Sequence, residues 1–564
     1  MLEFSPAFPL IIAALVAGFT RGRVRAVVML AAPILSGLNL MAMDSGLLTH
    51  AELFGLPLTP VRVDKLSMLF GILFHIAAFI GVIYALNQKD PIQDVAALSY
   101  AGSAVGAVFA GDLLTLFVYW ELLALTSVFL ILARRTPRAL AAGLRYLIMQ
   151  VGSGVLLLVG VLVMIAVGHD ISFNYIGLDA PGGLLIFLAF GVKSAFPLLH
   201  NWLTDGYPEA TPVGTVFLSA FTTKVAVYSL ARGFAGTEIL VYIGALMTCF
   251  PIFYAVIEND LRRVLAYSMI NQIGFMVVGV GIGTELALNG AVAHAFNDVL
   301  FKGLLMMSMG AVLHVTGEMR GSELGGLYKK MPKTAVLCMV GAASISAFPL
   351  FSGFVSKSMV VAAALKEGYN GIWLMLLFAA AGVFHHAGIK IPFFAFFYKD
   401  SKFVKEAHEA PTNMLVAMGL AATLCIGIGC FPGFLYDLLP YNTDFTPYDV
   451  SHVLSQLQLL AFSALAFTWL KLAHIYPPEL KSINVDAEWL YRWVLPRWTV
   501  ALRERLAPTD AWLRNWAVSK VFGGIRMLKT QHDIYGAMAR AWPIGNMVMW
   551  VAVLLGAMLI SFYM

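Results

Sequence analysis

The proline-containing string Lys-Ser-Ala-Phe-Pro-Leu at residues 193–198 decides the fold, because most of it recurs as Ser-Ala-Phe-Pro-Leu at residues 346–350. Each copy puts a proline inside a membrane-length apolar span, where it removes a backbone hydrogen bond and opens the helix. Broken helices at matching positions in two halves point to transport sites in repeat-built transporters, although a five-residue match can also arise by chance. The pattern predicts an all-α membrane protein with an internal repeat.

The composition requires lipid as the solvent. Of 564 residues, 60% are hydrophobic and only 12% are charged, which excludes a soluble domain. Apolar stretches of about 20 residues, the length that crosses a bilayer, recur along the chain. We expect about 16 transmembrane helices, at residues 7–20, 26–44, 65–87, 93–110, 113–133, 139–168, 183–204, 211–233, 237–257, 262–282, 285–315, 333–365, 371–397, 411–432, 452–474 and 546–563.

The two proline strings fall in the seventh and twelfth spans, so we expect these two helices to be broken. Spans 4 to 8 and 9 to 13 then form two five-helix repeats that begin on opposite sides of the membrane and are inverted. The expected organisation is 1–90 for helices 1–3, 91–234 for the first repeat, 235–400 for the second, 401–475 for helices 14 and 15, 476–545 for a cytoplasmic-side lateral segment and 546–564 for the final helix.

The basic residues fix the orientation. They cluster in loops that lie on one side of the membrane if the spans alternate, at residues 21–25, 134–138, 262–263 and 329–333. The positive-inside rule places these loops in the cytoplasm and both termini on the outer side of the cell inner membrane. The net charge of +5 is explained by these loops, so no nucleic-acid partner is expected.

The tail of the chain differs from the rest. Residues 475–545 hold five tryptophans between Trp489 and Trp516 together with many basic residues. An apolar stripe at helical spacing indicates a helix lying in the membrane interface; it consists of Leu513, Trp516, Ala517, Val521, Ile525 and Leu528. Gly523-Gly524 allows a bent helix or two short ones, and packing against the chain's own bundle is the alternative to an interfacial position.

Ionisable residues inside the spans are the candidate functional residues, since a charge at the bilayer centre costs about 3 kcal/mol on insertion scales and needs a partner. The deepest are Glu121, Lys193, Lys224, His294, Asp298, Lys302 and Lys357. His294, Asp298 and Lys302 follow at four-residue steps and share one helical face. Secondary candidates are His200, Asp205 and Lys390, the last of which can instead anchor its helix at the interface.

These residue types suit a proton path. Desolvation favours the neutral amine, so a lysine between apolar walls can both hold and release a proton near neutral pH. A nearby acid has the opposite effect, so an approach of Glu121 to Lys193 would switch that lysine between its charged and neutral forms. No metal site or cofactor is expected, because the four cysteines lack metal or redox spacing and the histidines lack a ligand pattern.

The run from Lys193 through His200, Trp202, Asp205 and Pro212 to Lys224 resembles the signature of the antiporter-like subunits of respiratory complex I and the Mrp multisubunit sodium/proton antiporters. Trp120-Glu121, residues 294–302 and residues 353–357 are similar to other motifs of that family in the same order. The resemblance covers roughly residues 60 to 430.

The resemblance implies roles for individual residues. Glu121 would pair with Lys193, Lys224 would connect inward, and Lys357 would form the exit. His294 and Lys302 would lie between the halves. Asp298 stands where many relatives have a second histidine; an acid there can hold His294 or Lys302 protonated, or contribute to a cation site. A lysine at position 224 is similar to the D-type Mrp subunit, whereas the amphipathic tail with its final span resembles the largest antiporter-like subunit of complex I.

The sequence favours a proton-translocating subunit of a multisubunit monovalent cation/proton antiporter, with protons, Na⁺, other membrane subunits and the lipid bilayer as its partners. Three alternatives share the fold: a membrane-arm subunit of complex I or a related hydrogenase, the membrane partner of an inorganic-carbon uptake complex, and a pump working alone. Of other classes, a haem or flavin enzyme lacks its expected motifs. A passive scaffold would tolerate neutralisation of the buried charges.

Overall fold

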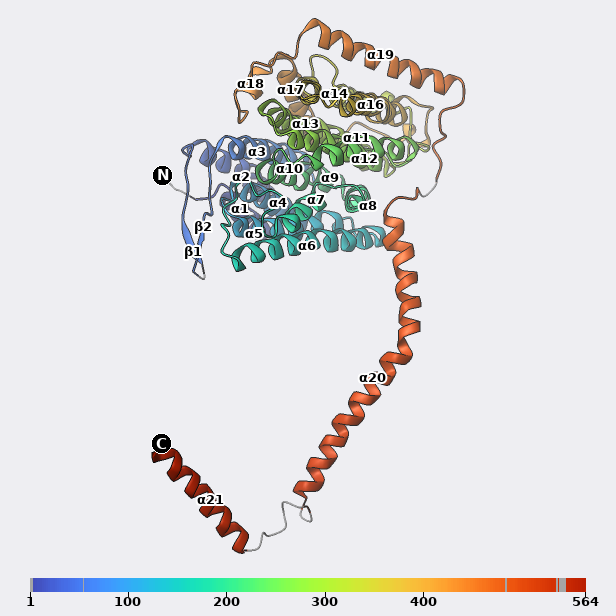
Figure 1. Ribbon diagram of the computed structural model, residues 1–564. Helices are drawn as coiled ribbons and strands as arrows, with labels where there is room; N and C mark the ends of the chain where they lie inside the picture. Colours follow the sequence, from blue (N-terminus) through green and yellow to red (C-terminus); the bar gives the residue numbers. More distant parts are fainter. Residues whose placement is uncertain (1–3, 54, 482–483, 534–535, 537–543, 564) are drawn as a thin grey trace. The chain divides into compact units, whose positions relative to one another are not determined.

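The structure is a computed structural model that describes residues 4–53, 55–481, 484–533, 536 and 544–563. It divides into two compact units, residues 1–486 and residues 487–564. The first unit is almost entirely helical (Figure 1). Its α-helices and strands are α1 (Ala7–Phe19), α2 (Gly22–Met41), β1 (Ala51–Leu53), β2 (Leu56–Leu58), α3 (Lys65–Ala85), α4 (Pro91–Phe109), α5 (Leu113–Leu132), α6 (Pro137–Ala166), α7 (Gly183–Lys193), α8 (Asn201–Glu209), α9 (Pro212–Ala220), α10 (Thr222–Gly233), α11 (Ile239–Ile257), α12 (Leu261–Ile282), α13 (Glu285–Thr316), α14 (Pro332–Ile345), α15 (Ser352–Lys366), α16 (Asn370–Val383), α17 (Thr412–Cys430), α18 (Gly433–Tyr436) and α19 (Val450–Leu472).

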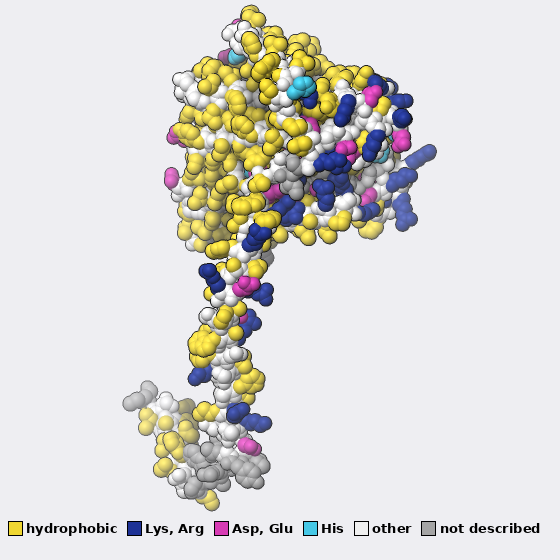
Figure 2. Space-filling model, turned by 90° about the vertical axis from the view of Figure 1, so that its right-hand side faces the viewer, with side chains coloured by type: hydrophobic (Ala, Val, Ile, Leu, Met, Phe, Trp, Pro, Cys, Tyr) yellow, Lys and Arg dark blue, Asp and Glu magenta, His cyan; other side chains and the backbone are white. Residues whose placement is uncertain are grey.

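Thirteen helices in the described part of the chain are long and apolar enough to cross a membrane, and α1, α7 and α14 are shorter apolar helices. Together they correspond to the expected spans, with the broken spans represented by the pairs α7–α8 and α14–α15. Hydrophobic side chains cover much of the first unit, while Lys and Arg gather in one region of the face shown in Figure 2. The prediction of an all-α polytopic membrane fold is confirmed.

The two proline strings adopt one backbone conformation. Ala195 and Leu198 have φ of 60° and 70°, and the matching Ala347 and Leu350 have φ of 57° and 73°. The hydrogen bonds match as well: Phe196 N donates to Gly191 O at 3.0 Å, and Phe348 N to Ala343 O at 3.0 Å. Positive φ is unfavourable for these residue types, so the shared geometry supports an internal repeat.

A second pair of contacts also supports the repeat. Asp112 forms a backbone bridge to Ser172, and Asp260 forms one to Arg320, so both partners are shifted by 148 residues. Asp112 and Asp260 are also N-caps, of α5 and α12 respectively, whose carboxylates accept backbone N–H groups of the first helical turn. In each half, therefore, the aspartate that caps a helix also bridges to a corresponding loop residue.

Two helix irregularities lie outside the expected breaks. The eighth span is interrupted between α9 and α10 at Phe221, which has φ −106° and ψ −66°. The thirteenth span continues from α16 into π-helical turns at Phe384–Lys390 and Phe393–Phe397. Such π turns often occur at functional sites.

The second unit contains a π-helical turn, Leu490–Val494, followed by α20 (Leu495–His532) and α21 (Ile544–Tyr563). Although Pro508 and Gly523-Gly524 weaken it, α20 is assigned as one helix of 38 residues, so the alternative of two short helices is wrong. It is not among the candidate membrane spans of the described residues, whereas α21 is. Residues 476–486, which we expected to belong to the lateral segment, are part of the first unit.

Candidate proton path

The 32-residue helix α13 carries the centre of the site. His294, Asp298 and Lys302 lie on it at four-residue steps, and all three are fully buried. A buried charge needs a partner from a neighbouring element. Each of the three side chains has one, and the partners come from three different helices.

Asp298 pairs with Lys224 of α10. Lys224 Nζ lies 2.5 Å from Asp298 Oδ2, and both side chains have an exposure of 0%. Lys224 Nζ also donates to Ser219 O, 3.2 Å away in α9, on the other side of the break at Phe221. Asp298, for which His294, Lys302 or a cation were the expected counterparts, thus forms its ion pair across two helices with Lys224, which the break at Phe221 places against α13.

His294 connects α12 to α15 through its two ring nitrogens. Nε2 lies 3.1 Å from Gln272 Oε1, and Nδ1 lies 3.0 Å from Ser356 Oγ. With Gln272 accepting, Nε2 carries the hydrogen, and the Ser356 hydroxyl donates to Nδ1. The imidazole thus has a donor on one side and an acceptor on the other, the arrangement that a proton relay requires.

Lys302 and Lys357 bind neutral oxygens. Lys302 Nζ donates to Ser268 Oγ of α12 at 2.8 Å. Lys357 Nζ donates to Ile345 O at 3.0 Å and lies 5.0 Å from the centroid of the Phe275 ring. Ile345 is the last residue of α14, so the proline break supplies the carbonyl that holds the Lys357 amine.

Lys193 has an analogous environment. Its Nζ donates to the backbone oxygen of Trp120 at 2.6 Å and lies 4.4 Å from the centroid of that residue's ring. Lys193 is the last residue of α7, immediately before the break, and its side chain is fully buried. Both broken spans therefore have a lysine held by a backbone carbonyl and an aromatic ring.

Glu121 follows Trp120 in the sequence, but its side chain does not bind Lys193. Its carboxylate forms no ion pair with Lys193 among the described residues, and its buried Oε1 has no hydrogen-bond partner. Gly154 of α6 provides its space, since a Cβ on Gly154 would overlap Glu121 Oε1. The expected pair of Glu121 and Lys193 is thus not formed here, and the two residues remain neighbours.

The secondary candidates all have partners. His200 Nε2 lies 3.1 Å from Asp486 Oδ2, which also accepts from Tyr267 at 2.7 Å. Asp205 pairs with Arg145 at 2.7 Å.

Lys390 binds the end of α11. Its Nζ donates to Ala255 O, Val256 O and Glu258 O at 3.3, 2.7 and 2.7 Å, and it pairs with Glu479 at 2.9 Å. The alternative of structural anchoring therefore fits Lys390 best.

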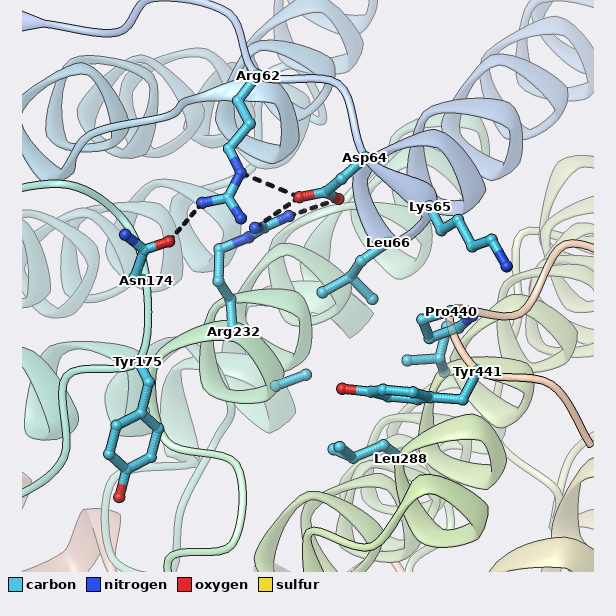
Figure 3. Close-up of a pocket in the computed structure, with 12 residues that line it drawn as sticks. Arg62, Asp64, Lys65, Leu66, Asn174, Tyr175, Arg232, Leu288, Pro440 and Tyr441 are labelled. Carbon is cyan, nitrogen blue, oxygen red and sulfur yellow. Dashed lines mark hydrogen bonds and ion pairs between the residues drawn. The ribbon is translucent and has the colours of Figure 1, made fainter. Parts of the chain in front are cut away.

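A cavity of about 380 Å³ lies at the end of α10, where Arg232 lines it (Figure 3). Lys224, Tyr228 and Arg232 share one face of α10, and Arg232 Nε donates to the Tyr228 hydroxyl at 2.9 Å. Asp64 accepts from Arg232 at 2.8 Å and from Arg62 at 3.1 Å, so one carboxylate links two guanidinium groups. Lys224 at the central ion pair and Arg232 at the cavity thus lie on one face of α10, two turns apart.

Sequence reasoning missed these partners. Ser268, Gln272 and Ser356 are neutral polar residues inside apolar helices, so they were not among the ionisable candidates. The signal in the sequence is their position: Ser268 and Gln272 lie one turn apart on α12, and Ser356 directly precedes Lys357 on α15. Within the described residues, no group of three or more His, Cys, Asp or Glu side chains is arranged to hold a metal ion.

Comparison with known proteins identifies relatives. The chain is 27% identical over 428 residues to hydrogenase-4 component B of Escherichia coli (strain K12), covering 66% of this chain and 63% of that protein. It is 29% identical over 424 residues to the A-type component of the Na⁺/H⁺ antiporter of Alkalihalophilus pseudofirmus, covering 66% of this chain and 53% of that protein. The chain thus spans less than two thirds of the length of these relatives.

Solved structures share the fold. A chain of the Mrp complex from Dietzia sp. DQ12-45-1b has a TM-score of 0.74 at 24% identity, covering 98% of this chain and 61% of that chain. A chain of the archaeal membrane-bound sulfane sulfur reductase has a TM-score of 0.71 at 21% identity, covering 99% of both chains. Residues 110–384 match the family described as NADH:quinone oxidoreductase/Mrp antiporter, TM. Through these residues just under half of the chain is similar to the antiporter-like membrane subunits that this family describes.

Proposed function

We propose that this chain is the proton-translocating membrane subunit of a multisubunit Na⁺/proton antiporter of the inner membrane. One observation carries the proposal: the fully buried ion pair of Lys224 and Asp298 joins α10 to α13, and α13 also carries the buried His294 and Lys302. Several ionisable groups at membrane depth are costly, and a scaffold or a packing role would not need them.

The proposed path uses the buried groups in sequence. A proton enters at Lys193, whose charge is set by the distance of Glu121, and passes to Lys224. Neutralisation of Lys224 leaves the Asp298 carboxylate without its cation, and this uncompensated charge draws the next proton towards Lys302, one turn along α13, and from there to Lys357. His294 relays between the α12 and α15 sides through Gln272 and Ser356. Lys357, at the second break, releases the proton.

Substitution on α15 tests the path. Lys357→Met removes the buried amine, while Lys366→Met removes an exposed lysine from the same helix. Both variants are made in the intact assembly, and Na⁺-dependent proton flux is measured in inverted vesicles with a pH-sensitive dye. We expect Lys357→Met to lose flux by about 10²-fold or more, as for removal of a proton-transfer group, and Lys366→Met to retain it. Normal flux in Lys357→Met would refute the proposed path.

A second candidate is a membrane-arm subunit of a redox-driven pump, either complex I or a related hydrogenase. The relative named hydrogenase-4 component B and the fold shared along the whole chain with the sulfane sulfur reductase favour it. The two candidates differ in their partners and in the energy source. Gentle extraction of the tagged chain, followed by mass spectrometry, distinguishes them: small hydrophobic subunits support the antiporter, and iron–sulfur or nickel proteins support the redox pump.

A further inference from the structure

Two cavities lie along the seam between α2 and α3, far in sequence from the proton path. The first, of about 720 Å³, is lined by four basic side chains and one acid: Arg21, Arg23, Arg25, Lys89 and Asp94. We call it the basic pocket. The charge distribution of the loops places this end of α2 on the cytoplasmic side of the membrane.

The charges in the basic pocket are unbalanced. Asp94 is buried and lies 3.4 Å from Arg25, which also donates to the carbonyl oxygens of Ala17 and Thr20. Arg21, Arg23 and Lys89, by contrast, are exposed and have no hydrogen bond or ion pair from their side chains within the described part of the chain. Three positive charges therefore face one pocket without an anion.

The second cavity continues the first in the direction of the membrane. It measures about 470 Å³ and is almost wholly apolar; we call it the apolar groove. Met29 lines the basic pocket, and Pro33, one helical turn further along α2, begins the apolar groove. Its other lining side chains come from α2, α3 and α17, among them Ile34, Leu38, Ile76, Phe79 and Leu424.

The dimensions suit one lipid molecule. From Ala26 to Leu38 the helix rises about 18 Å, close to the roughly 15 Å of hydrocarbon in one leaflet. Ile34 and Leu38 are 49% and 62% exposed, so the groove opens sideways towards the bilayer. The seam is charged at the membrane surface and apolar over the depth of one leaflet. This arrangement matches the charged head group and the apolar acyl chain of a phospholipid.

We propose that the seam between α2 and α3 binds an anionic phospholipid, with its phosphate in the basic pocket and an acyl chain in the apolar groove. Guanidinium groups bind phosphate through paired hydrogen bonds, and basic pockets between cytoplasmic helix ends recognise anionic head groups. The alternative occupant is a helix from another protein. Such a helix would need acidic side chains at the height of the basic pocket to balance the charges of Arg21, Arg23 and Lys89. The site is independent of the proposed function.

Lipid retention tests the basic pocket. The full chain, with the subunits that copurify, is placed in nanodiscs of equal parts phosphatidylglycerol and phosphatidylethanolamine, and retained lipids are counted by native mass spectrometry after partial delipidation. The variant Arg21→Gln/Arg23→Gln/Lys89→Gln is compared with a control that removes three exposed lysines from other cytoplasmic loops, Lys330→Gln/Lys333→Gln/Lys405→Gln. We expect about tenfold lower phosphatidylglycerol retention in the first variant only.

A second variant tests the apolar groove. At Gly37 an added Cβ would meet its nearest atom, in His75, at 3.7 Å, an ordinary contact, so Gly37→Leu fits and fills the groove. We expect this variant to lose phosphatidylglycerol while its binding of inorganic phosphate stays unchanged. Equal phosphatidylglycerol retention in the triple variant and its control would overturn the proposal. Full phosphatidylglycerol retention in Gly37→Leu would also overturn it, because that result would indicate a site for the anion alone. A crosslinking experiment with the variant Ala26→Cys would overturn it as well if the cysteine were crosslinked to a protein instead of to lipid.

Discussion

Lys224 Nζ lies 2.5 Å from Asp298 Oδ2, and neither side chain is exposed. Removing one member of a buried ion pair leaves an uncompensated charge and costs about 3–5 kcal/mol, whereas replacing both by apolar residues of similar volume is often neutral. Stability and transport should therefore respond differently to single and double substitutions at these positions.

We expect Asp298→Asn to lower thermal stability and to abolish Na⁺-dependent proton flux. The double variant Lys224→Met/Asp298→Leu should recover most of the stability without recovering flux. Differential scanning fluorimetry and vesicle flux measure the two properties. Glu285→Gln is the matched control, because Glu285 is an exposed acid at the start of the same helix. Transport by the double variant would exclude this pair from the path.

Lys193→Ala should abolish exchange and leave the protein folded, since it removes the amine held by the Trp120 carbonyl at the first break. The exposed Lys330→Ala serves as its control. The measurement is flux normalised to the amount of folded protein from size-exclusion chromatography. If Lys193→Ala exchanges ions at the normal rate, the proposed entry point is wrong.

Gly154→Ala should move the Glu121 carboxylate without unfolding the chain, because its Cβ would overlap the far end of that flexible side chain. Gly152, two residues earlier on α6, has no atom within 4 Å of an added Cβ, so Gly152→Ala is the matched control. We expect flux to fall several-fold in Gly154→Ala at near-normal stability. Equal flux in the two variants would show that the position of Glu121 does not matter.

Lys390→Met should act on stability alone, since Lys390 binds three carbonyls near the end of α11 and pairs with Glu479. Burial raises the pKa of Glu479 and the charge of Lys390 lowers it again, so loss of the lysine leaves a buried acid without its cation. We expect a lower melting temperature with unchanged flux per folded protein. Flux loss beyond the loss of folded protein would instead place Lys390 in the path.

Asp64 should contribute to stability only above acidic pH. Burial raises the pKa of this carboxyl, but the hydrogen bond and charge of Arg232 outweigh burial, and the pKa lies below its ordinary value. A lowered folded pKa gives stability that is present above about pH 4 and is lost as the pH falls further.

Asp64→Asn should therefore melt at a lower temperature than the wild type at neutral pH, and the gap should close below about pH 4. Asp44→Asn, at an exposed acid in the same region of the chain, should show no such gap. A gap for Asp64→Asn that persists at low pH would contradict the assigned ion pair.

Much of the architecture follows from the sequence alone. Apolar length predicts the spans because a bilayer requires about 20 residues per crossing, and the two proline strings predict the breaks because proline cannot continue the helix hydrogen bonds. The burial of Lys193, Lys224 and Lys302 follows from their depth in these spans, since charge is excluded from the lipid-facing surface.

Tertiary structure alone decided which groups meet. Asp298 pairs with Lys224 because a break at Phe221, which no proline marks, places α10 against α13. Lys390 anchors α11 because Glu479 and the end of that helix come together around it. Spacing along one helix determines which side chains share a face, but a contact between helices depends on their packing and rotation, which the periodicity of a single helix does not contain.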